Sequence, residues 1–366
     1  MLYDKFVING MTVPNRLVRS ATWEGLATQE GFVTPELTDT MLELVRGGVG
    51  LVITSHMFVT EQGRAGERQL GIHSDDCIAG LRTMVEDIHA ENGVVVAQLA
   101  HAGGQAAQDI SGMPALGPSP FARRDGTLCD TMTEQDIEAF VRGFEQAASR
   151  AVAAGFDGVQ IHGAHGYALS QFLSPALSKR QDAYGGSIEN RMWLLIRVYE
   201  AIRTVVGEKY PVLLKINSED FVEHGLTAEE SLLVIEELAD RGLDAVEVSG
   251  GFLSSSPKVS PVRVGRFDTP TKEVWYRSAV SNIRERCKLP LMVVGGVRSF
   301  SVAEGLLTDG LVDFVAMSRP LIREPALLQR WKAGELRRAD CISCNKCYGV
   351  IINKLGFYCP FVHDGA

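Results

Sequence analysis

Eight short apolar runs, each ending in small or polar residues, constrain the fold of this 366-residue chain more than any other feature. They lie at Arg16–Thr22, Gly50–Ser55, Val94–Leu99, Gly158–His162, Val212–Asn217, Ala245–Ser249, Leu291–Val294 and Phe314–Met317. Near-continuous apolar strands are typical of parallel sheets that are covered on both faces. Segments with helical periodicity separate the runs, as in repeated strand–helix units. Eight units predict an α/β fold that closes into a single (β/α)8 TIM barrel.

The longest helical segments carry recognisable start and stop signals. They are predicted at Thr133–Ala154, Ser187–Val206 and Thr227–Arg241. Thr133 and Thr227 are typical N-cap residues, and a glycine follows the end of each segment. A doubly wound sheet is the alternative fold, but no Gly-x-Gly-x-x-Gly follows the first strand. We expect a barrel over residues 1–335 and a cysteine-rich C-terminal extension over residues 336–366, packed on the barrel.

Composition and charge exclude several classes of partner. The formal net charge is −9, whereas a nucleic-acid-binding protein needs a concentrated basic surface. The chain has no apolar stretch of about 18 residues, so no membrane span is expected. Its N-terminus has neither a basic nor an apolar signal region, and a cytoplasmic location follows as the expectation. The seven cysteines do not resemble the disulfide framework of a small secreted domain.

Polar side chains gather at the carboxyl ends of the predicted strands, where TIM barrels place their active sites. In chain order they are Ser20, Ala21, Thr22, Gln98, His162, His165, Tyr167, Lys215, Gly295, Gly296, Ser318 and Arg319. Two long connections, Ala102–Asp130 and Gly251–Pro270, are expected to shape the same site.

The ends of the last two strands predict a phosphate site. Glycine at 295 and 296 lets backbone N–H groups approach an anion, and Arg319 offers a bidentate donor after Ser318. Two tight turns with a surface arginine are the structural alternative. Lys215 ends an otherwise apolar strand, so its charge requires an anionic partner. Glu219, Asp220 or an anionic cofactor would serve.

His162, His165 and Tyr167 form the most reactive group of this set. Two neutral imidazoles, three residues apart, could hold one carbonyl oxygen or bind a metal. The tyrosine could donate a proton. Structural histidines in a turn, and a tyrosine that only completes a hydrogen-bond network, are the alternatives.

Four motifs, in this order along the chain, resemble the Old Yellow Enzyme (NADH:flavin oxidoreductase) family. They are Asn15-Arg-Leu-Val-Arg-Ser20, Gln98-Leu-Ala-His-Ala-Gly103, His162-Gly-Ala-His-Gly-Tyr-Ala-Leu-Ser-Gln-Phe-Leu-Ser-Pro175 and Tyr184-Gly-Gly-Ser-Ile-Glu-Asn-Arg191. The match runs from about residue 3 to residue 335. Each motif alone is weak, but the ordered set is specific.

The resemblance implies FMN bound across the top of the barrel. Ser20, Ala21 and Thr22 would line the flavin ring, and Gln98 would bond its pyrimidine edge. Lys215 would stabilise the anionic reduced flavin. The phosphate would be held by Gly295, Gly296, Ser318 and Arg319.

The resemblance also implies a ping-pong ene-reductase. NAD(P)H would reduce the flavin and leave, and an electron-poor alkene such as an enone or enoate would take its place. His162 and His165 would hold the carbonyl oxygen of the alkene. Flavin N5 would give hydride to the β-carbon, and Tyr167 would protonate the α-carbon. The choice between NADH and NADPH, the substrate and the formation of a homo-oligomer stay open.

Two features depart from the general family pattern. Trp23 stands where a cysteine or threonine usually tunes the flavin, so the reduction potential and the pocket size are open.

Near the C-terminus, Cys341, Cys344, Cys347 and Cys359 resemble the [4Fe–4S] ligands of 2,4-dienoyl-CoA and 2-enoate reductases, with one residue fewer between the second and third cysteine. A cluster, a zinc ion and free thiols all remain open. Those relatives have a further FAD- and NAD(P)H-binding domain, which we expect to be absent here.

Two other functions compete with an ene-reductase. A metal-dependent barrel hydrolase would use His101, His162 and His165, but it lacks an aspartate at a strand end. A flavin and iron–sulfur electron-transfer module would need a separate electron-donor protein as its partner.

Overall fold

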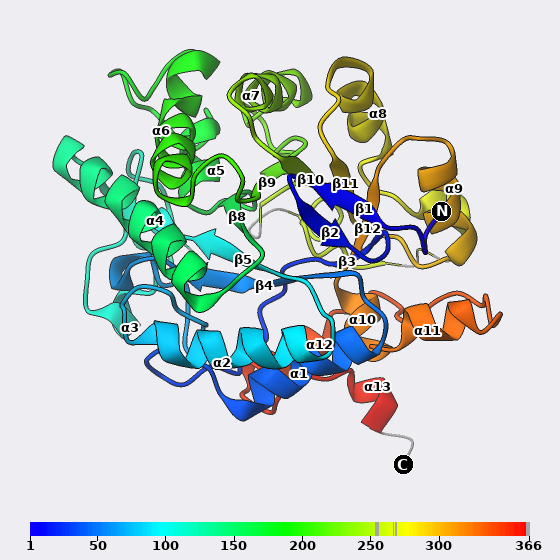
Figure 1. Ribbon diagram of the computed structural model, residues 1–366. Helices are drawn as coiled ribbons and strands as arrows, with labels where there is room; N and C mark the ends of the chain where they lie inside the picture. Colours follow the sequence, from blue (N-terminus) through cyan, green and yellow to red (C-terminus); the bar gives the residue numbers. More distant parts are fainter. Residues whose placement is uncertain (124, 253–255, 266, 268, 364–366) are drawn as a thin grey trace.

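The computed structural model describes residues 1–123, 125–252, 256–265, 267 and 269–363. Eight parallel strands close into a barrel, in the spatial order β3, β4, β5, β8, β9, β10, β11 and β12 (Figure 1). Their bounds are β3 Leu17–Arg19, β4 Leu51–Phe58, β5 Val95–Ala100, β8 Gly158–Gly163, β9 Val212–Asn217, β10 Ala245–Ser249, β11 Leu291–Val294 and β12 Phe314–Met317. The predicted TIM barrel is therefore confirmed.

The strand bounds agree with prediction from β9 onward, and the first strands differ. The first strand is shorter than predicted, because residues 20–22 leave the sheet after Arg19. The hydroxyl of Thr22 donates to the Ser20 carbonyl at 2.9 Å, which bends this segment. Strand β4 is longer than predicted, and its pairing with β5 shifts register between Ile53 and His56.

Helices surround the barrel, because each strand is followed by an amphipathic segment that buries its apolar face against the sheet (Figure 1). The outer helices are α1 Pro35–Arg46, α2 Cys77–Ala90, α4 Glu134–Ala154, α6 Ile188–Val206, α7 Ala228–Asp240, α8 Arg277–Arg286 and α9 Phe300–Thr308. As predicted, Thr133 and Thr227 are N-caps, and each forms a capping box with the acid three residues later.

Four short helices follow β12 in the residues that the structure describes. They are α10 Arg319–Arg323, α11 Leu327–Lys332, α12 Lys346–Ile352 and α13 Pro360–His363. In Figure 1 they lie together on one side of the barrel, with α13 at the C-terminal end. The guanidinium of Arg323 in α10 donates to the Cys359 sulfur at 3.7 Å, which links the last cysteine to the barrel.

An N-terminal hairpin, which the sequence analysis did not anticipate, covers one end of the barrel. It pairs β1 Phe6–Ile8 with β2 Met11–Val13, and its turn places Asn9 and Gly10 at positive φ. Ile8, Met11 and Val13 pack with the side chains that fill the barrel interior. This end holds the amino ends of the strands, so the site must open at the other.

The two long connections contain short elements of their own. Residues 102–130 include η2 Gly103–Gln105, α3 Gln108–Ser111 and strand β6 Leu116–Gly117, which pairs with β7 Asp130–Thr131. Residue 124 of this connection lies outside the described residues, as do residues 253–255, 266 and 268 of the connection expected at Gly251–Pro270.

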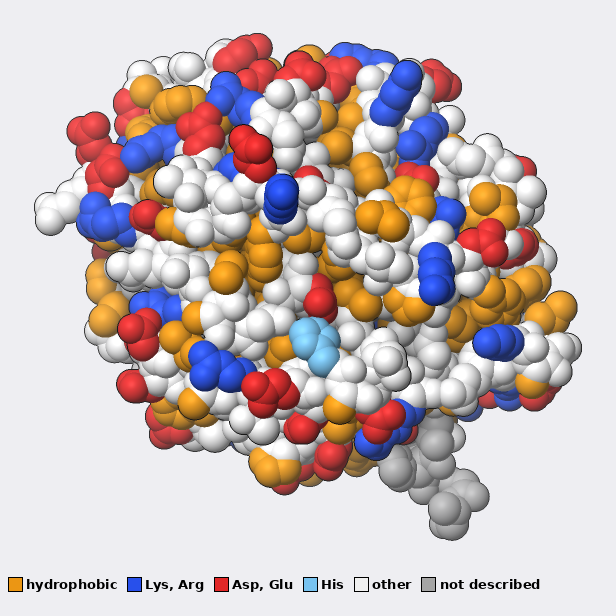
Figure 2. All heavy atoms as spheres, viewed as in Figure 1, with side chains coloured by type: hydrophobic (Ala, Val, Ile, Leu, Met, Phe, Trp, Pro, Cys, Tyr) orange, Lys and Arg blue, Asp and Glu red, His pale blue; other side chains and the backbone are white. Residues whose placement is uncertain are grey.

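The surface carries charges of both signs. Figure 2 shows basic and acidic side chains interspersed over one face, with no continuous basic area on it. This agrees with the net charge of −9 and offers no electrostatic track for a nucleic acid on that face. In the described part of the chain, we find no helix with the length and apolar character that a membrane crossing requires.

The ring of Phe314 is expected to stabilise the packing of the N-terminal hairpin on the barrel. Its buried ring packs edge-on against Phe6, with ring centroids 5.1 Å apart, and joins the hairpin to the barrel interior. Phe314→Ala should lower the free energy of unfolding by about 3–5 kcal/mol, because it leaves a cavity in a close-packed core. Urea unfolding would measure the loss. Val7→Ala is the matched control, since Val7 lies in the same hairpin with 56% of its side chain exposed. Equal losses in the two variants would contradict the role of the packed ring.

Candidate active site

A cavity opens at the carboxyl ends of the barrel strands. The predicted site residues that line it are Ser20, Ala21, Thr22, Gln98, His162, His165, Tyr167, Lys215, Gly295, Ser318 and Arg319. Gly296 does not line the cavity but follows Gly295 directly. The barrel thus brings together residues from six strand ends in one cavity, at the end of the fold where TIM barrels bind their ligands.

A buried ion pair forms the floor of the cavity. The Lys215 ammonium donates to the Ser20 hydroxyl at 2.7 Å and to the Glu247 carboxylate at 3.1 Å. Ser20 in turn donates to the same carboxylate oxygen at 2.6 Å. Lys215 therefore has the anionic partner that its burial requires, but it is Glu247 rather than Glu219 or Asp220. The sequence signal for Glu247 was a single acid inside the apolar strand β10.

A chain of amides extends this network across the barrel. Gln98 donates to the Gln160 side-chain oxygen at 2.7 Å, and Gln160 donates to Glu247 at 2.9 Å. All three side chains are buried. Because Gln98 is held through its amide nitrogen, its orientation at the cavity wall is fixed by hydrogen bonds.

His162 and His165 stand side by side, with ring centroids 5.2 Å apart. His165 has φ of 64°, an unusual conformation for a residue with a side chain, and Asn217 holds it by accepting its backbone N–H at 3.1 Å. Its Nε2 lies 2.7 Å from the Ser249 hydroxyl, whereas His162 Nδ1 is buried without a partner among the described residues.

Burial is the main reason that the pKa of both histidines falls well below its usual value, and the charge of Lys215 lowers both further. Both imidazoles are therefore neutral at neutral pH, and each carries one N–H. An N–H on a neutral ring can donate a hydrogen bond to a substrate oxygen without giving up its proton.

Tyr167 is the N-cap residue of helix α5 (Ala168–Leu173), and its ring centroid lies 5.2 Å from that of His162. It also stacks on His56, a residue that the sequence analysis missed, with centroids 5.4 Å apart. The Tyr167 hydroxyl lies 3.4 Å from His56 Nε2. His56 had no sequence signal, because its direction depends on the register shift in β4.

Two side chains with unpaired donors lie next to the cavity residues Gly295 and Arg319, near the ends of β11 and β12. Atoms Nε and Nη2 of Arg263, and Nε1 of Trp275, are buried without a partner among the described residues. Arg319 lies beside them, donating to the Arg263 carbonyl at 2.9 Å. Cations and N–H groups without acceptors are the surroundings that a phosphate group requires.

Steric contacts explain why glycine occupies positions 295 and 296. A Cβ on Gly295 would lie 2.8 Å from the Tyr276 ring, and one on Gly296 would lie 2.5 Å from Trp275 Nε1. Both residues also have positive φ, of 134° and 86°. Arg263 and Trp275 were not predicted, because the connection that carries Arg263 has no regular pattern.

Trp23 lines the cavity, with its Nε1 buried and without a partner among the described residues. Its ring lies edge-on to His56 and to Tyr348 of α12, with centroids 6.5 Å and 6.2 Å away. The bulky side chain at this position therefore narrows the cavity on the side of the C-terminal helices.

The four C-terminal cysteines line one small cavity beside the main one, and Cys347 borders both. Burial first, then the neighbouring thiols, raise the pKa of Cys347 to about 11. Among the residues that the structure describes, no three His, Cys, Asp or Glu side chains are arranged to hold a metal ion. Metal binding by Cys341, Cys344, Cys347 and Cys359 stays a prediction.

His101 does not join the other histidines. Its ring packs at 4.8 Å from Phe140, and its Nδ1 accepts the Gly103 N–H at 3.0 Å. Burial lowers its pKa to about 3. The arrangement needed for a metal-dependent hydrolase is therefore missing from the described residues.

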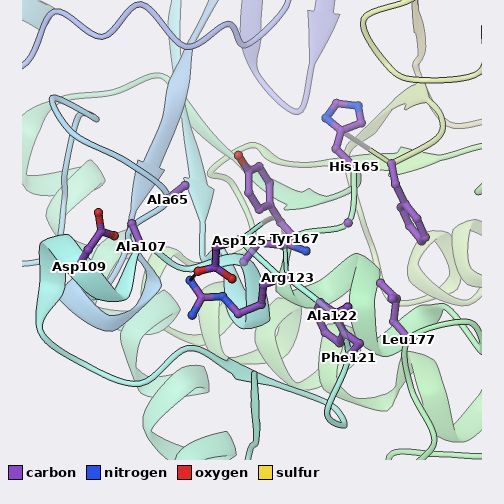
Figure 3. A pocket seen from close by; sticks show the side chains of 13 residues that line it. Ala65, Ala107, Asp109, Phe121, Ala122, Arg123, Asp125, His165, Tyr167 and Leu177 are labelled. Atoms are coloured by element: carbon purple, nitrogen blue, oxygen red, sulfur yellow. Dashed lines mark ion pairs between the residues drawn. The ribbon is translucent and has the colours of Figure 1, made fainter. Parts of the chain in front are cut away.

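A second cavity adjoins the first, with His165 and Tyr167 in the wall of both. Figure 3 shows this cavity, with Phe121, Arg123 and Asp125 of the 102–130 connection around it. Arg123 and Asp125 form an ion pair at 3.6 Å. The connection therefore lines the second cavity, whereas none of its described residues lines the main one.

Comparisons with known proteins agree with the geometry. The model of the NADH:flavin oxidoreductase / NADH oxidase family matches residues 1–337. A NADH oxidase of Thermoanaerobacter brockii is 34% identical over 94% of this chain and 52% of its own length. A NADPH dehydrogenase of Halalkalibacterium halodurans is 35% identical over 88% of this chain and 91% of its own length.

Among solved structures, 2-naphthoyl-CoA reductase in complex with 2-naphthoyl-CoA superimposes with a TM-score of 0.88 at 25% identity, covering 96% of this chain and 55% of that one. The chain thus spans about half the length of this reductase and of the NADH oxidase. Because the family model covers the whole barrel and its strand ends, the chain belongs to the NADH:flavin oxidoreductase / NADH oxidase family, as its ordered motifs predicted.

Proposed function

We propose that this protein is an FMN-dependent ene-reductase that uses NAD(P)H to reduce an activated carbon–carbon double bond. The observation that carries the proposal is the paired His162 and His165 beside Tyr167, facing one cavity with Lys215 at its floor. Family membership and the names of the relatives, an NADH oxidase and an NADPH dehydrogenase, support the redox partner. The reductase with 2-naphthoyl-CoA supports an unsaturated carbonyl compound as the substrate.

The residues of the cavity fit FMN. Gly295, Gly296, Ser318 and Arg319 would hold the phosphate, and the neighbouring Arg263 would add positive charge. Ser20, Ala21 and Thr22 would line the ring, with Gln98 at its pyrimidine edge. Lys215 would place positive charge beside the ring. A bound flavin would supply the hydride chemistry between NAD(P)H and the alkene.

The protein side chains would orient and polarise the substrate. The neutral rings of His162 and His165 would donate hydrogen bonds to its carbonyl oxygen, which withdraws electron density from the conjugated double bond. Tyr167 would then give its hydroxyl proton to the α-carbon. Since both histidines are neutral, their hydrogen bonds to the substrate oxygen should not weaken as the pH rises from about 6 to about 8, the range around the usual imidazole pKa.

The absorption spectrum tests the proposal. We expect purified protein supplied with FMN to show flavin bands that bleach with NADH or NADPH and return when a cyclic enone is added anaerobically. The two half-reactions are then measured separately by stopped flow. A protein that binds no FMN, or whose reduced bands an enone does not restore, would refute the proposal.

Tyr167→Phe tests the proton donor. The variant should slow re-oxidation by the enone by about 10²-fold or more, which is typical for loss of a general acid. Reduction by NAD(P)H should change little, because hydride transfer to the flavin needs no proton from this residue. Equal slowing of both half-reactions would show that the ring shapes the cavity instead.

A second candidate function, electron transfer with a separate donor protein, is favoured by the position of the cysteines. The cavity they line shares Ile322, Arg319, Asn345 and Cys347 with the main cavity. A [4Fe–4S] cluster bound there would lie beside the flavin site.

Metal analysis separates the alternatives for the cysteines. Anaerobically prepared protein with a cluster should contain iron and acid-labile sulfide in equal amounts, and Cys347→Ser should lose both. Cys287→Ser is the control, because Cys287 is buried elsewhere in the barrel. Zinc in place of iron would indicate a structural site, and neither metal would indicate free thiols.

A further inference from the structure

We propose that His56 is a positioning residue that directs the hydroxyl proton of Tyr167 toward the substrate and stabilises the phenolate left after proton transfer. His56 would do so by donating a hydrogen bond from its Nε2–H to the Tyr167 oxygen. This inference rests on the proposed function, in which Tyr167 protonates the α-carbon. It assigns a task to a third histidine in the cavity beside the two that would hold the substrate oxygen.

The backbone of β4 places His56 at the cavity. Strands β4 and β5 pair regularly up to Ile53 and Val96, and pairing resumes with His56 opposite Gln98. Three residues of β4 thus span two of β5, which is a bulge. In a regular strand the side-chain direction alternates, and an extra residue re-aims everything after it. The bulge therefore turns His56 toward the barrel mouth.

Two contacts hold the residue at this point. Its carbonyl accepts the Gln69 side-chain N–H at 2.7 Å, and Gln69 accepts the Ala65 N–H at 2.7 Å through its oxygen. Strand β4 is thereby fixed to the segment that returns along it. The imidazole is free of these backbone contacts and faces the cavity.

The ring of His56 is aligned with its neighbour. The planes of His56 and Tyr167 are stacked at 20°, with Nε2 3.4 Å from the hydroxyl oxygen. This distance is long for a hydrogen bond, as is common before a substrate closes a site. Trp23 packs edge-on against the same imidazole and limits its rotation.

The charge state of His56 suits a donor rather than an acid. Burial, with the charge of Lys215 added, lowers its pKa to about 4. The ring therefore stays neutral during the reaction. The titratable groups near it include Tyr167, Lys215, His162 and His165. A neutral ring with its proton on Nε2 donates to the tyrosine oxygen, so the tyrosine proton must point elsewhere.

The proton balance of the step is simple. The O–H bond of Tyr167 breaks and a C–H bond forms at the α-carbon, while the hydride of the proposed reaction reaches the β-carbon. The phenolate that remains accepts a hydrogen bond from the Nε2–H of His56, which keeps its proton. A proton from water then restores the tyrosine, and His56 is unchanged.

His56→Phe removes the donor but keeps a planar ring to stack on Tyr167. We expect enone re-oxidation to slow by about 10- to 100-fold, since a hydrogen bond to a charged group contributes roughly 1.5–3 kcal/mol. Reduction by NAD(P)H and the dissociation constant of FMN should stay within about twofold. His56→Gln keeps an N–H donor of similar reach and should recover most of the rate. His73→Gln is the matched control, because His73 packs on Phe58 outside the cavity.

Two further readouts separate positioning from simple packing. The rate of enone re-oxidation should fall at high pH as Tyr167 loses its proton, and without the stabilising donor this fall should move to higher pH in His56→Phe. In a Tyr167→Phe background, His56→Phe should add no further loss, since the two residues act through one hydrogen bond.

The Tyr167→Phe and His56→Phe variants together show whether the proposed function fails or only the role of His56. If Tyr167→Phe re-oxidises at the normal rate, the proton role of Tyr167 fails, and the inference on His56 fails with it. If Tyr167→Phe is slow but His56→Phe is normal, only the inference on His56 is overturned. An additive loss in the double variant, or an unchanged pH profile in His56→Phe, would also overturn it.

Discussion

The buried ammonium of Lys215 is the interaction on which the site depends. An isolated cation in a barrel interior would cost several kcal/mol, and here Ser20 and Glu247 offset that cost by direct hydrogen bonds. These partners come from β10 and from the segment after β3, so the pair exists only when the barrel is closed. Its polar extension through Gln160 and Gln98 reaches the far wall of the cavity. Folding of the barrel and assembly of the site are therefore one event.

The same cation acts on the cavity above it. Burial is the main cause of the low pKa of His56, His162 and His165, and Lys215 adds to it in all three. Neutral imidazoles are hydrogen-bond donors that do not exchange their protons with the substrate at neutral pH. Under the proposed function, this leaves Tyr167 as the proton source and gives the positive charge of Lys215 to the flavin. The buried charge of Lys215 would thus help to keep the three imidazoles as neutral hydrogen-bond donors and leave proton transfer to Tyr167.

The two ends of the barrel are built for different purposes. At the amino ends of the strands, the hairpin of β1 and β2 closes the core with apolar side chains. At the carboxyl ends, buried donors of Trp275 and Arg263 have no hydrogen-bond partner in the part of the chain that the structure describes. Unpaired buried donors cost free energy, so they mark a place where a ligand is expected. The C-terminal helices extend this end, where Asn345 donates to the Val262 carbonyl at 2.7 Å.

The sequence by itself determined the barrel and about half of the cavity lining. Apolar runs and helix caps are local signals, and the carboxyl end of a parallel strand is a position that can be read from the chain. Lys215 and His162 were expected at strand ends for this reason, and both line the cavity. The family followed from four ordered motifs for the same reason.

Only the tertiary structure decided which groups meet. The sequence did not show which acid pairs with Lys215, and only the closed barrel places the Glu247 carboxylate beside its ammonium. His56 faces the cavity because a bulge in β4 changed its direction, and no spacing in the sequence records a bulge. Arg263 and Trp275 come together from a connection without periodicity and the segment before α8. In each case the contact joins residues far apart in the chain, so its energy depends on the closed barrel and not on local pattern.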